Sequence, residues 1–439
     1  MQIKDHKYFN KKRISYYWEL EPGEILEYYK ISRSLQFINR NPDREANATL
    51  FAGKKPGTTD ILLNVDTYFP IHMLFSFDRE GAVSTSKDRW GFGIRHNNIL
   101  GLDDTVLAGY SPGKRSNNIY AYHSLPLTNF GTSLMYGFTR SESFPKKDFE
   151  SFDLRSYAKT GSCFIYQDIY KRDKYLGQVQ FGLDGSDKTV YTKDGVLNRD
   201  RIRVLRLGGE FVIRWLNSVT YIKPSISQGV NLFGARRKSP LSSRDAENTF
   251  TKANIGFRYR KPIPPAFQMN VKSKVQFASE KLPPQEEFSF GGINSVRGYP
   301  SGDYYADNAI QVSAEFLVPP LFLPEEIRLP YAERPLKEDI TGLIFFDYGY
   351  GTKRGERQGE DNEQKLAGIG IGLRMHLFNQ ALLRLEWGFP IEMGDKPISE
   401  TANSRFYISL NFEDRIPQEI ERIRKMMERE NIEQAAWNI

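Results

Sequence analysis

The stretch Phe288-Ser-Phe-Gly-Gly-Ile-Asn-Ser-Val-Arg-Gly-Tyr-Pro-Ser-Gly-Asp-Tyr-Tyr305 combines four glycines and one proline with aromatic residues at both ends. Glycine and proline at this density exclude a helix or the interior of an ordinary strand. A solvated surface loop has little use for five aromatic side chains, or for one cation, Arg297, at its centre. The pattern predicts a loop that folds back into protein, where Arg297 needs a partner.

The composition limits the class of protein to which this loop belongs. The 439 residues suffice for two or three soluble domains or for one large β-barrel. A charged fraction of 26% and a mean hydropathy of −0.54, with no run of about 18 apolar residues, argue against a helical membrane protein. The 30 Phe, 24 Tyr and 35 Gly favour a transmembrane barrel, in which only alternate strand residues face lipid. A soluble all-β protein has a similar composition.

Charge and cysteine content exclude several functions. The net charge of +7 comes from Lys and Arg spread along the whole chain, so no nucleic-acid partner is expected. The single cysteine, Cys163, excludes an intrachain disulfide and fits no metal site. Residues 1–7 lack the apolar core of a signal peptide. For an exported protein, we therefore expect that the start of the chain is missing.

Residues 1–67 predict part of a small α+β module. Ile31, Leu35 and Ile38 recur at helical spacing, and a helix over this segment ends before Pro42. Two short strands, at 46–51 and 59–65, follow with a Gly- and Pro-containing turn between them. Residues 1–30 give only a weak helical pattern. A helix followed by a hairpin is half of such a module.

After residue 67 the periodicity changes to that of a large β-sheet. Segments of about ten residues alternate apolar and polar side chains, separated by Gly, Asp, Asn and Ser clusters. About sixteen segments in one uninterrupted series exceed what an ordinary sandwich holds, so residues 68–413 predict an all-β fold, an antiparallel transmembrane β-barrel of about sixteen strands. The segments begin at residue 71 and recur near 90–99, 103–110, 117–125, 129–139, 154–168, 174–186, 201–216, 218–226, 250–260, 265–278, 307–318, 340–350, 366–377, 380–389 and 404–412.

The polar face of these segments carries full charges, which a water-filled lumen tolerates. Residues 414–439 differ, because their charged, helical pattern has a loose apolar stripe. Such a tail either binds a partner or a surface, or packs on its own protein.

No enzyme constellation is found. The five histidines are scattered without ligand spacing, so neither a metal nor another cofactor is expected. Gly368-Ile-Gly-Ile-Gly372 superficially resembles a dinucleotide loop, but its glycines alternate inside a predicted strand and no helix follows. Close approach of another backbone explains these glycines better.

Two carboxylates are candidate partners for Arg297. In the segment 340–350, Asp347 shares the inward face with Leu343 and Phe345, and in 307–318 Glu315 also faces inward. An arginine can hold a carboxylate in a bidentate pair that fixes orientation. The alternative is an exposed arginine in an external loop, which contributes almost nothing to stability.

Phe290-Gly-Gly-Ile-Asn-Ser-Val-Arg-Gly-Tyr299 resembles the lid-loop motif of the Omp85 superfamily. In that superfamily the loop between strands eleven and twelve enters a sixteen-stranded barrel, and its arginine meets an aspartate of a Phe-x-Asp-x-Gly motif on strand thirteen. The resemblance implies that the lid motif is Val296, Arg297, Gly298 and Tyr299, with Asp347 and Glu315 as lumen partners. The lid loop is then 288–305.

Within the superfamily, the chain most resembles two-partner secretion transporters of the haemolysin-activator type. Asn41-Pro-Asp-Arg44 is similar to their junction between a POTRA domain and the barrel, and Asn98-Ile-Leu-Gly-Leu-Asp103 matches a further barrel segment. Leu385 to Pro390 and Phe406 to Phe412 resemble the last two strands. The chain departs from the pattern at Asp78-Arg-Glu-Gly81, in its tail after Phe412, and in lacking a signal peptide, a plug helix, the first POTRA domain and about half of the second.

The resemblance implies a monomeric barrel in the outer-membrane lipid of a diderm bacterium. It exports an unfolded partner polypeptide without ATP, by way of the lumen that Arg297 and Asp347 shape. The alternative within the superfamily is an assembly factor that inserts other barrels, although such factors usually carry several POTRA domains. A passive pore and a soluble β-rich binding protein are further alternatives.

Overall fold

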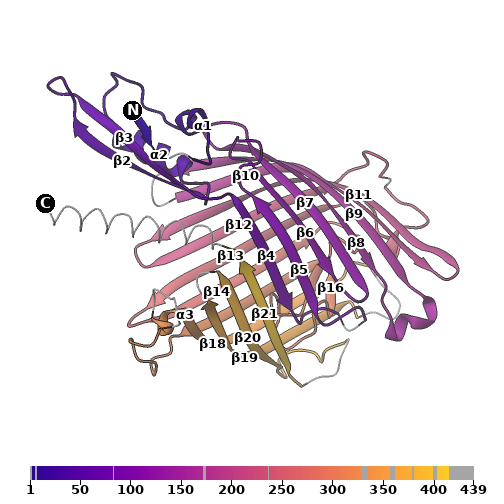
Figure 1. Cartoon of the computed structure of the whole chain (residues 1–439). Coiled ribbons are helices and arrows are strands. Elements are labelled where there is room, and N and C mark those ends of the chain that lie inside the picture. The colour runs from indigo at the N-terminus through magenta and orange to yellow at the C-terminus, as the bar shows by residue number, and fades with distance from the viewer. Residues whose placement is uncertain are drawn as a thin grey trace.

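The computed structural model describes residues 2–4, 7–82, 84–171, 175–235, 237–328, 335–355, 361–377, 380–398 and 403–414 (Figure 1). Sixteen antiparallel strands close into a barrel, and β21 pairs with β4 to complete it. The predicted all-β fold with an antiparallel barrel of sixteen strands is therefore confirmed. The strands are β4 (Ile71–Asp78), β5 (Arg89–His96), β6 (Thr105–Pro112), β7 (Ser116–Pro126), β8 (Thr132–Ser143), β9 (Arg155–Lys171), β10 (Tyr175–Thr192), β11 (Gly195–Trp215), β12 (Ser218–Gly229), β13 (Thr251–Ile263), β14 (Phe267–Ala278), β17 (Asn308–Val318), β18 (Ile340–Thr352), β19 (Glu363–Leu377), β20 (Ala381–Pro390) and β21 (Arg405–Glu413).

The barrel wall is taller on one side than on the other. Strands β9, β10 and β11 have 17, 18 and 21 residues, and β10 and β11 stay paired from Tyr175 to Thr192. The sequence pattern places these strands correctly but underestimates the lengths of β10 and β11. Their pairing continues through polar residues beyond the apolar band. At the opposite extreme, β21 and β4 pair only between Ser409 and Glu413 on β21.

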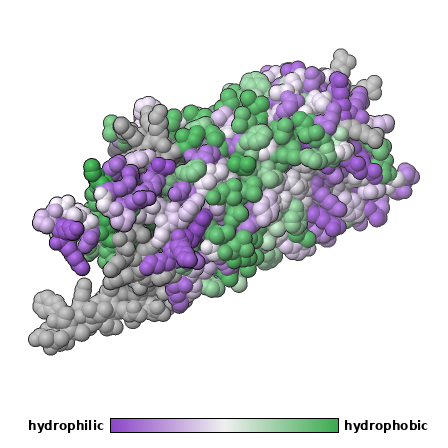
Figure 2. All heavy atoms as spheres, turned by 90° about the horizontal axis from the view of Figure 1, so that it is seen from above, coloured by the Kyte–Doolittle hydropathy of each residue, from purple (hydrophilic) through white to green (hydrophobic). Residues whose placement is uncertain are grey.

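The side chains alternate between lumen and exterior as the two-residue period requires. Figure 2 shows hydrophobic residues gathered over the middle of the barrel and hydrophilic ones toward its ends. On β18, for example, Ile344 is exposed whereas Leu343, Phe345 and Asp347 are buried. Further exposed, outward-facing apolar residues are Trp90, Phe92, Ile94, Phe138, Phe181, Leu207, Ile226, Ile255, Phe277, Ile310, Phe316, Ile369, Ile371, Trp387 and Phe406.

The N-terminal module contains more than the predicted helix and hairpin. It comprises β1 (Gln2–Lys4), α1 (Lys11–Tyr16), α2 (Tyr28–Ile38), β2 (Arg44–Ala52) and β3 (Thr59–Thr67). The sheet order is β1-β3-β2, with β1 parallel to β3. Because α1 and β1 are short and polar, their periodicity is too weak to read from sequence. Helix α1 becomes stable by contributing Ile14 to a core, and β1 by pairing with β3. The core comprises Phe9, Ile14, Tyr17, Phe37, Ile38, Ala46, Leu63 and Val65.

The remaining elements are short. They are η1 (Lys147–Phe152), η2 (Ser243–Asp245), β15 (Phe288–Phe290), β16 (Tyr304–Ala306) and α3 (Leu336–Asp339). Within the described residues, no helix has the length and apolar character needed to cross a membrane. The predicted helical tail 414–439 lies, except for Asp414, outside the described residues.

Candidate functional site

The loop predicted as the lid, residues 288–305, lies in the connection from β14 to β17 and folds inward as a compact unit, here called the lumen loop. Its ends pair with each other as the small sheet β15–β16. Its aromatic residues explain the composition of the stretch, since they pack into a buried cluster with Leu366 of β19. The loop members of that cluster are Phe290, Val296, Tyr299 and Tyr304.

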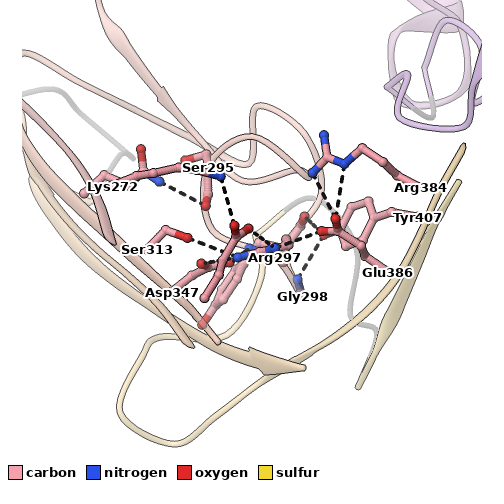
Figure 3. A network of polar contacts seen from close by, with 12 residues as sticks. Lys272, Ser295, Arg297, Gly298, Ser313, Asp347, Arg384, Glu386 and Tyr407 are labelled. Carbon is pink, nitrogen blue, oxygen red and sulfur yellow. Dashed lines mark hydrogen bonds and ion pairs between the residues drawn. The ribbon is translucent and has the colours of Figure 1, made fainter. Parts of the chain in front are cut away.

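Arg297 lies at the tip of the lumen loop and is almost completely buried, at 1% exposure. Its Nε and Nη2 donate to the two carboxylate oxygens of Asp347 at 2.7 and 2.8 Å, and its backbone N–H donates to the same carboxylate at 3.0 Å (Figure 3). Nη1 donates to Glu315 at 2.9 Å and to Glu386 at 2.8 Å. Nη2 also donates to Ser313 Oγ at 3.1 Å. All five guanidinium N–H groups thus have an acceptor.

The partners of Arg297 come from three strands of the barrel wall. Ser313 and Glu315 lie on β17, Asp347 on β18 and Glu386 on β20. The ring of Phe345 on β18 lies 3.5 Å from the guanidinium carbon and covers one face of it. The structure therefore brings Arg297 together with Asp347 and with Glu315, the two carboxylates that the sequence pattern places on the inward face.

Two of the three carboxylates, Glu315 and Glu386, are shared with other cations, so the site forms one network. Glu315 also binds Arg374 Nη2 at 2.7 Å and Lys272 Nζ at 3.2 Å. Glu386 also binds Arg374 and Arg384. Burial alone lowers the pKa of the Arg297 guanidinium, but the hydrogen-bonded Asp347 and the other carboxylates raise that pKa overall. Arg297 is therefore held in its charged form.

Glycines let the tip of the lumen loop lie directly on the wall. Gly298 has φ of +102°, a backbone conformation that favours glycine. A Cβ on Gly368 of β19 would lie 1.9 Å from the Arg297 carbonyl oxygen. The alternating glycines of Gly368 to Gly372 thus include a site of close backbone approach, as the strand interpretation predicts. Tyr407 fastens the contact, because its hydroxyl accepts from Gly298 N–H at 2.9 Å and donates to the Tyr299 carbonyl at 2.8 Å.

Sequence reasoning did not find several members of this site. Glu386, Ser313 and Tyr407 lie on the polar, inward faces of their strands, but the sequence pattern connects none of them to the lumen loop. The alternation of side chains along each strand is the sequence signal for these residues, because it marks which of them face inward. It does not tell which inward residues meet across the lumen.

A second polar cluster joins the N-terminal module to the barrel rim. Arg44 Nη1 and Nη2 donate to the two carboxylate oxygens of Asp103 at 2.9 and 3.1 Å. Asp43 is also buried, and its carboxylate lies 2.8 Å from His72 Nε2 and 2.7 Å from Asn97 Nδ2. The motifs Asn41 to Arg44 and Asn98 to Asp103, which are similar to two separate segments of the family, thus meet in space.

The chemistry of the lumen site is that of ion pairing. Within the described ranges, no group of three or more His, Cys, Asp or Glu residues is arranged to hold a metal ion. The carboxylates of the site are occupied by arginine and lysine. The arrangement holds the lumen loop against the inner wall of the barrel.

A closed sixteen-strand barrel with an exposed apolar band and a loop pinned inside its lumen defines an outer-membrane barrel. Residues 57–375 match the family model described as haemolysin secretion/activation protein ShlB/FhaC/HecB, and the chain belongs to this family. The predicted membership in the Omp85 superfamily is confirmed. The family consists of transporters rather than enzymes, and its barrels lie in the outer membrane of Gram-negative bacteria.

The chain is 22% identical over 387 residues to the heme/hemopexin transporter protein HuxB of Haemophilus influenzae, an alignment that covers 85% of this chain and 65% of HuxB. It is 24% identical over 295 residues to the outer membrane transporter CdiB of Escherichia coli, covering 63% of this chain and 48% of CdiB. The chain therefore spans between about half and two thirds of the length of these relatives.

Solved structures show the same fold. CdiB from Escherichia coli superposes with a TM-score of 0.77 at 18% identity, covering 94% of this chain and 76% of CdiB. BamA from Haemophilus ducreyi, lacking POTRA domains 1–3, gives a TM-score of 0.63 at 13% identity, covering 94% of this chain and 83% of BamA.

Proposed function

We propose that this chain forms the outer-membrane pore of a two-partner secretion system and exports an unfolded partner polypeptide through its lumen without ATP. Membership in the haemolysin secretion/activation family supports this function. HuxB and CdiB, to which the chain is similar, are both named as transporters. The stretch Gly368 to Gly372, which superficially resembles a nucleotide-binding loop, lies inside strand β19 and is therefore not such a loop.

The observation that carries the proposal is the buried attachment of Arg297 to three wall strands. A loop of eighteen residues inside a barrel narrows the path that a polypeptide can take. We assign residues 288–305 as the lid, with Val296, Arg297, Gly298 and Tyr299 as its motif and Asp347 and Glu315 as its lumen partners. Ion pairs suit this role because they hold firmly yet can exchange one partner for another.

We further assign residues 1–67 as a POTRA-type module that captures the client. Among the residues that the structure describes, strand β2 pairs with β3 on one side, and its other edge is offered to an added strand. Its outer half, from Thr49 to Ala52, is exposed throughout, as such an addition requires. Residues 68–413 then form the conducting barrel, which contacts outer-membrane lipid through its apolar band and works as a monomer.

The proposal is tested by secretion of the exported polypeptide encoded beside this chain, in cells that contain the complete transporter gene. The variants Arg297→Ala and Asp347→Ala are expected to lower the amount of client in the medium while the barrel still shows heat-modifiable migration. Normal secretion by both variants would contradict the assigned role of the lid. Unchanged secretion after deletion of the whole gene, with loss of other outer-membrane barrels instead, would favour an assembly factor.

A further inference from the structure

The limb of chain that leads into the lumen loop, residues 279–287, carries a second buried charge. Glu286 is 7% exposed and lies against the barrel wall. Its Oε1 accepts from Arg206 Nη2 of β11 at 2.6 Å. Its Oε2 lies 2.7 Å from Lys252 Nζ of β13 and accepts from Arg206 Nη1 at 3.2 Å. Both oxygens of the carboxylate are thus paired with cations of the wall.

The backbone at Glu286 is held as well as the side chain. Its carbonyl oxygen accepts from Lys252 Nζ at 2.8 Å and from Gln276 Nε2 of β14 at 3.3 Å. Arg206 is itself oriented by Asp184 of β10, which accepts from Nε at 2.5 Å. Residues of β11, β13 and β14 therefore hold this one position of the limb directly, and Asp184 of β10 supports it through Arg206.

An apolar contact next to Glu286 holds the same limb. Leu282 is fully buried in a cluster with Ile202 and Val204 of β11, Phe250 and Ala278. Burial alone raises the pKa of the Glu286 carboxyl, but Lys252 and Arg206 lower that pKa overall. The carboxylate is therefore charged when the limb is docked.

The Glu286 contact and the Arg297 contact have opposite polarity. At Arg297 the chain supplies a cation to carboxylates on β17, β18 and β20, whereas at Glu286 it supplies a carboxylate to cations on β11 and β13.

The two contacts also differ in access to water. The Arg297 side chain is 2% exposed, whereas the Arg206 side chain is 23% exposed. A cavity of about 470 Å³ borders the second contact and is lined in part by Arg206, Asp184 and Glu286.

We propose that Glu286, held by Arg206 and Lys252, is a second anchor of the lumen loop and a positioning residue for transport. This inference rests on the proposed function of the loop as the lid of the pore. The loop leaves the lumen fully only when both anchors release. The Glu286 anchor releases first, because water reaches Arg206 and stabilises the separated charges.

Planar lipid bilayers in potassium chloride test the anchor without any client. The folded full chain is compared with the variants Glu286→Gln and Glu286→Lys. Each variant is expected to raise the time spent at the highest conductance level about tenfold, the population shift that a loss of about 1.4 kcal/mol produces. The double variant Glu286→Lys with Lys252→Glu restores an ion pair with the charges exchanged, so it is expected to return at least half of the way to the parent.

Glu210→Gln is the matched control. Glu210 lies on β11 four residues from Arg206 and makes an exposed pair with Lys223 Nζ at 3.4 Å, so its loss is expected to leave the conductance unchanged. Heat-modifiable migration shows that each barrel is folded, and the isosteric Glu286→Gln serves if Glu286→Lys does not fold. The proposal is overturned if Glu286→Gln conducts like the parent, or if the double variant conducts like Glu286→Lys. The conductance measurement uses only potassium chloride and therefore does not depend on export. If the Glu286 variants change the conductance but Arg297→Ala exports normally, Glu286 is still an anchor of the loop, whereas the proposed lid function is refuted.

Discussion

The lumen network around Arg297 and the junction cluster around Arg44 both bury arginine–aspartate pairs between segments that are distant in sequence. They differ in how many carboxylates each arginine binds. At the junction, Arg44 binds one carboxylate, Asp103, and Arg13 Nε lies 3.9 Å from the same carboxylate. In the lumen, Arg297 is shared by Asp347, Glu315 and Glu386. The difference teaches that burial alone does not set the cost of losing an arginine. What matters is whether the remaining carboxylates keep a cation.

Loss of Arg297 is expected to have the largest effect. Among the described residues, the ion pair of Asp347 is made with Arg297, so Arg297→Ala leaves a fully buried carboxylate uncompensated. Removal of one partner of a buried pair costs about 3–5 kcal/mol. We expect the tip of the loop to leave the wall while Glu286 still holds the limb, with strongly reduced export and a raised conductance.

Arg384→Ala is the control for Arg297→Ala, because it removes another lumen arginine while Glu386 keeps Arg297 and Arg374. Arg297→Lys keeps the charge but loses the five-donor fork, so it is expected to behave more like Arg297→Ala than like the parent. Equal export by Arg297→Ala and Arg384→Ala would refute the claim that the buried carboxylates depend on Arg297 in particular.

Asp347→Asn is expected to rank second. The substitution keeps the shape of the side chain but removes the charge that accepts three N–H groups of Arg297. Hydrogen bonds to charged groups contribute about 1.5–3 kcal/mol each, and the amide retains part of that. Glu315→Gln is expected to be milder, since Glu315 accepts one N–H group of Arg297 whereas Asp347 accepts three. Bilayer conductance ranks the two variants, and a larger effect for Glu315→Gln would contradict the central place of Asp347.

Arg44→Ala is expected to have the third largest effect. It should weaken docking of the N-terminal module to the barrel rather than change export or conductance. Asp103 retains Arg13 nearby, so we expect a loss of about 1.5–3 kcal/mol in docking of the module. Limited trypsin digestion of the folded protein measures it, as faster release of the module from the barrel. Conductance should stay at the parent level. A conductance change as large as that of Arg297→Ala would show that the two clusters are coupled.

The pH dependence of the Glu286 anchor is a smaller effect. The ordinary pKa of a glutamate carboxyl, 4.5, is lowered here by Lys252 and Arg206 against the effect of burial. Docking is therefore stabilised fully above pH 4.5, and the stabilisation is lost as pH falls through the lowered pKa. Conductance should rise in that acidic window, and Glu286→Gln should lack this component. An identical acid response in Glu286→Gln would contradict the assignment.

Arg40→Ala is expected to change least. Arg40 pairs with Asp168 at 2.5 Å, but its side chain is 47% exposed. Exposed pairs contribute about 1 kcal/mol or less. Export, conductance and trypsin digestion should all match the parent, and a clear loss of module docking would mean that the junction extends to this pair.

Much of the barrel could be predicted because strand periodicity is local. The alternation of Ile344 with Phe345 and Asp347 shows which side chains share a face before any neighbour is known. The lengths of β10 and β11 were underestimated, since strands that pair beyond the apolar band no longer need apolar residues. The third strand and second helix of the module were missed for a related reason: β1 has three residues and is defined by its pairing with β3.

The sequence by itself determined the barrel of about sixteen strands, the inward face of each strand and two inward carboxylates, Asp347 and Glu315, as candidate partners for Arg297. These follow from two-residue periodicity and from the need of a buried cation for a carboxylate. Only the tertiary structure decided that Glu386 shares Arg297, that Tyr407 fastens Gly298, and that Glu286 meets Arg206, 80 residues away in sequence. The physical reason is closure of the barrel, which brings inward residues of distant strands together and fixes where a loop can lie among them.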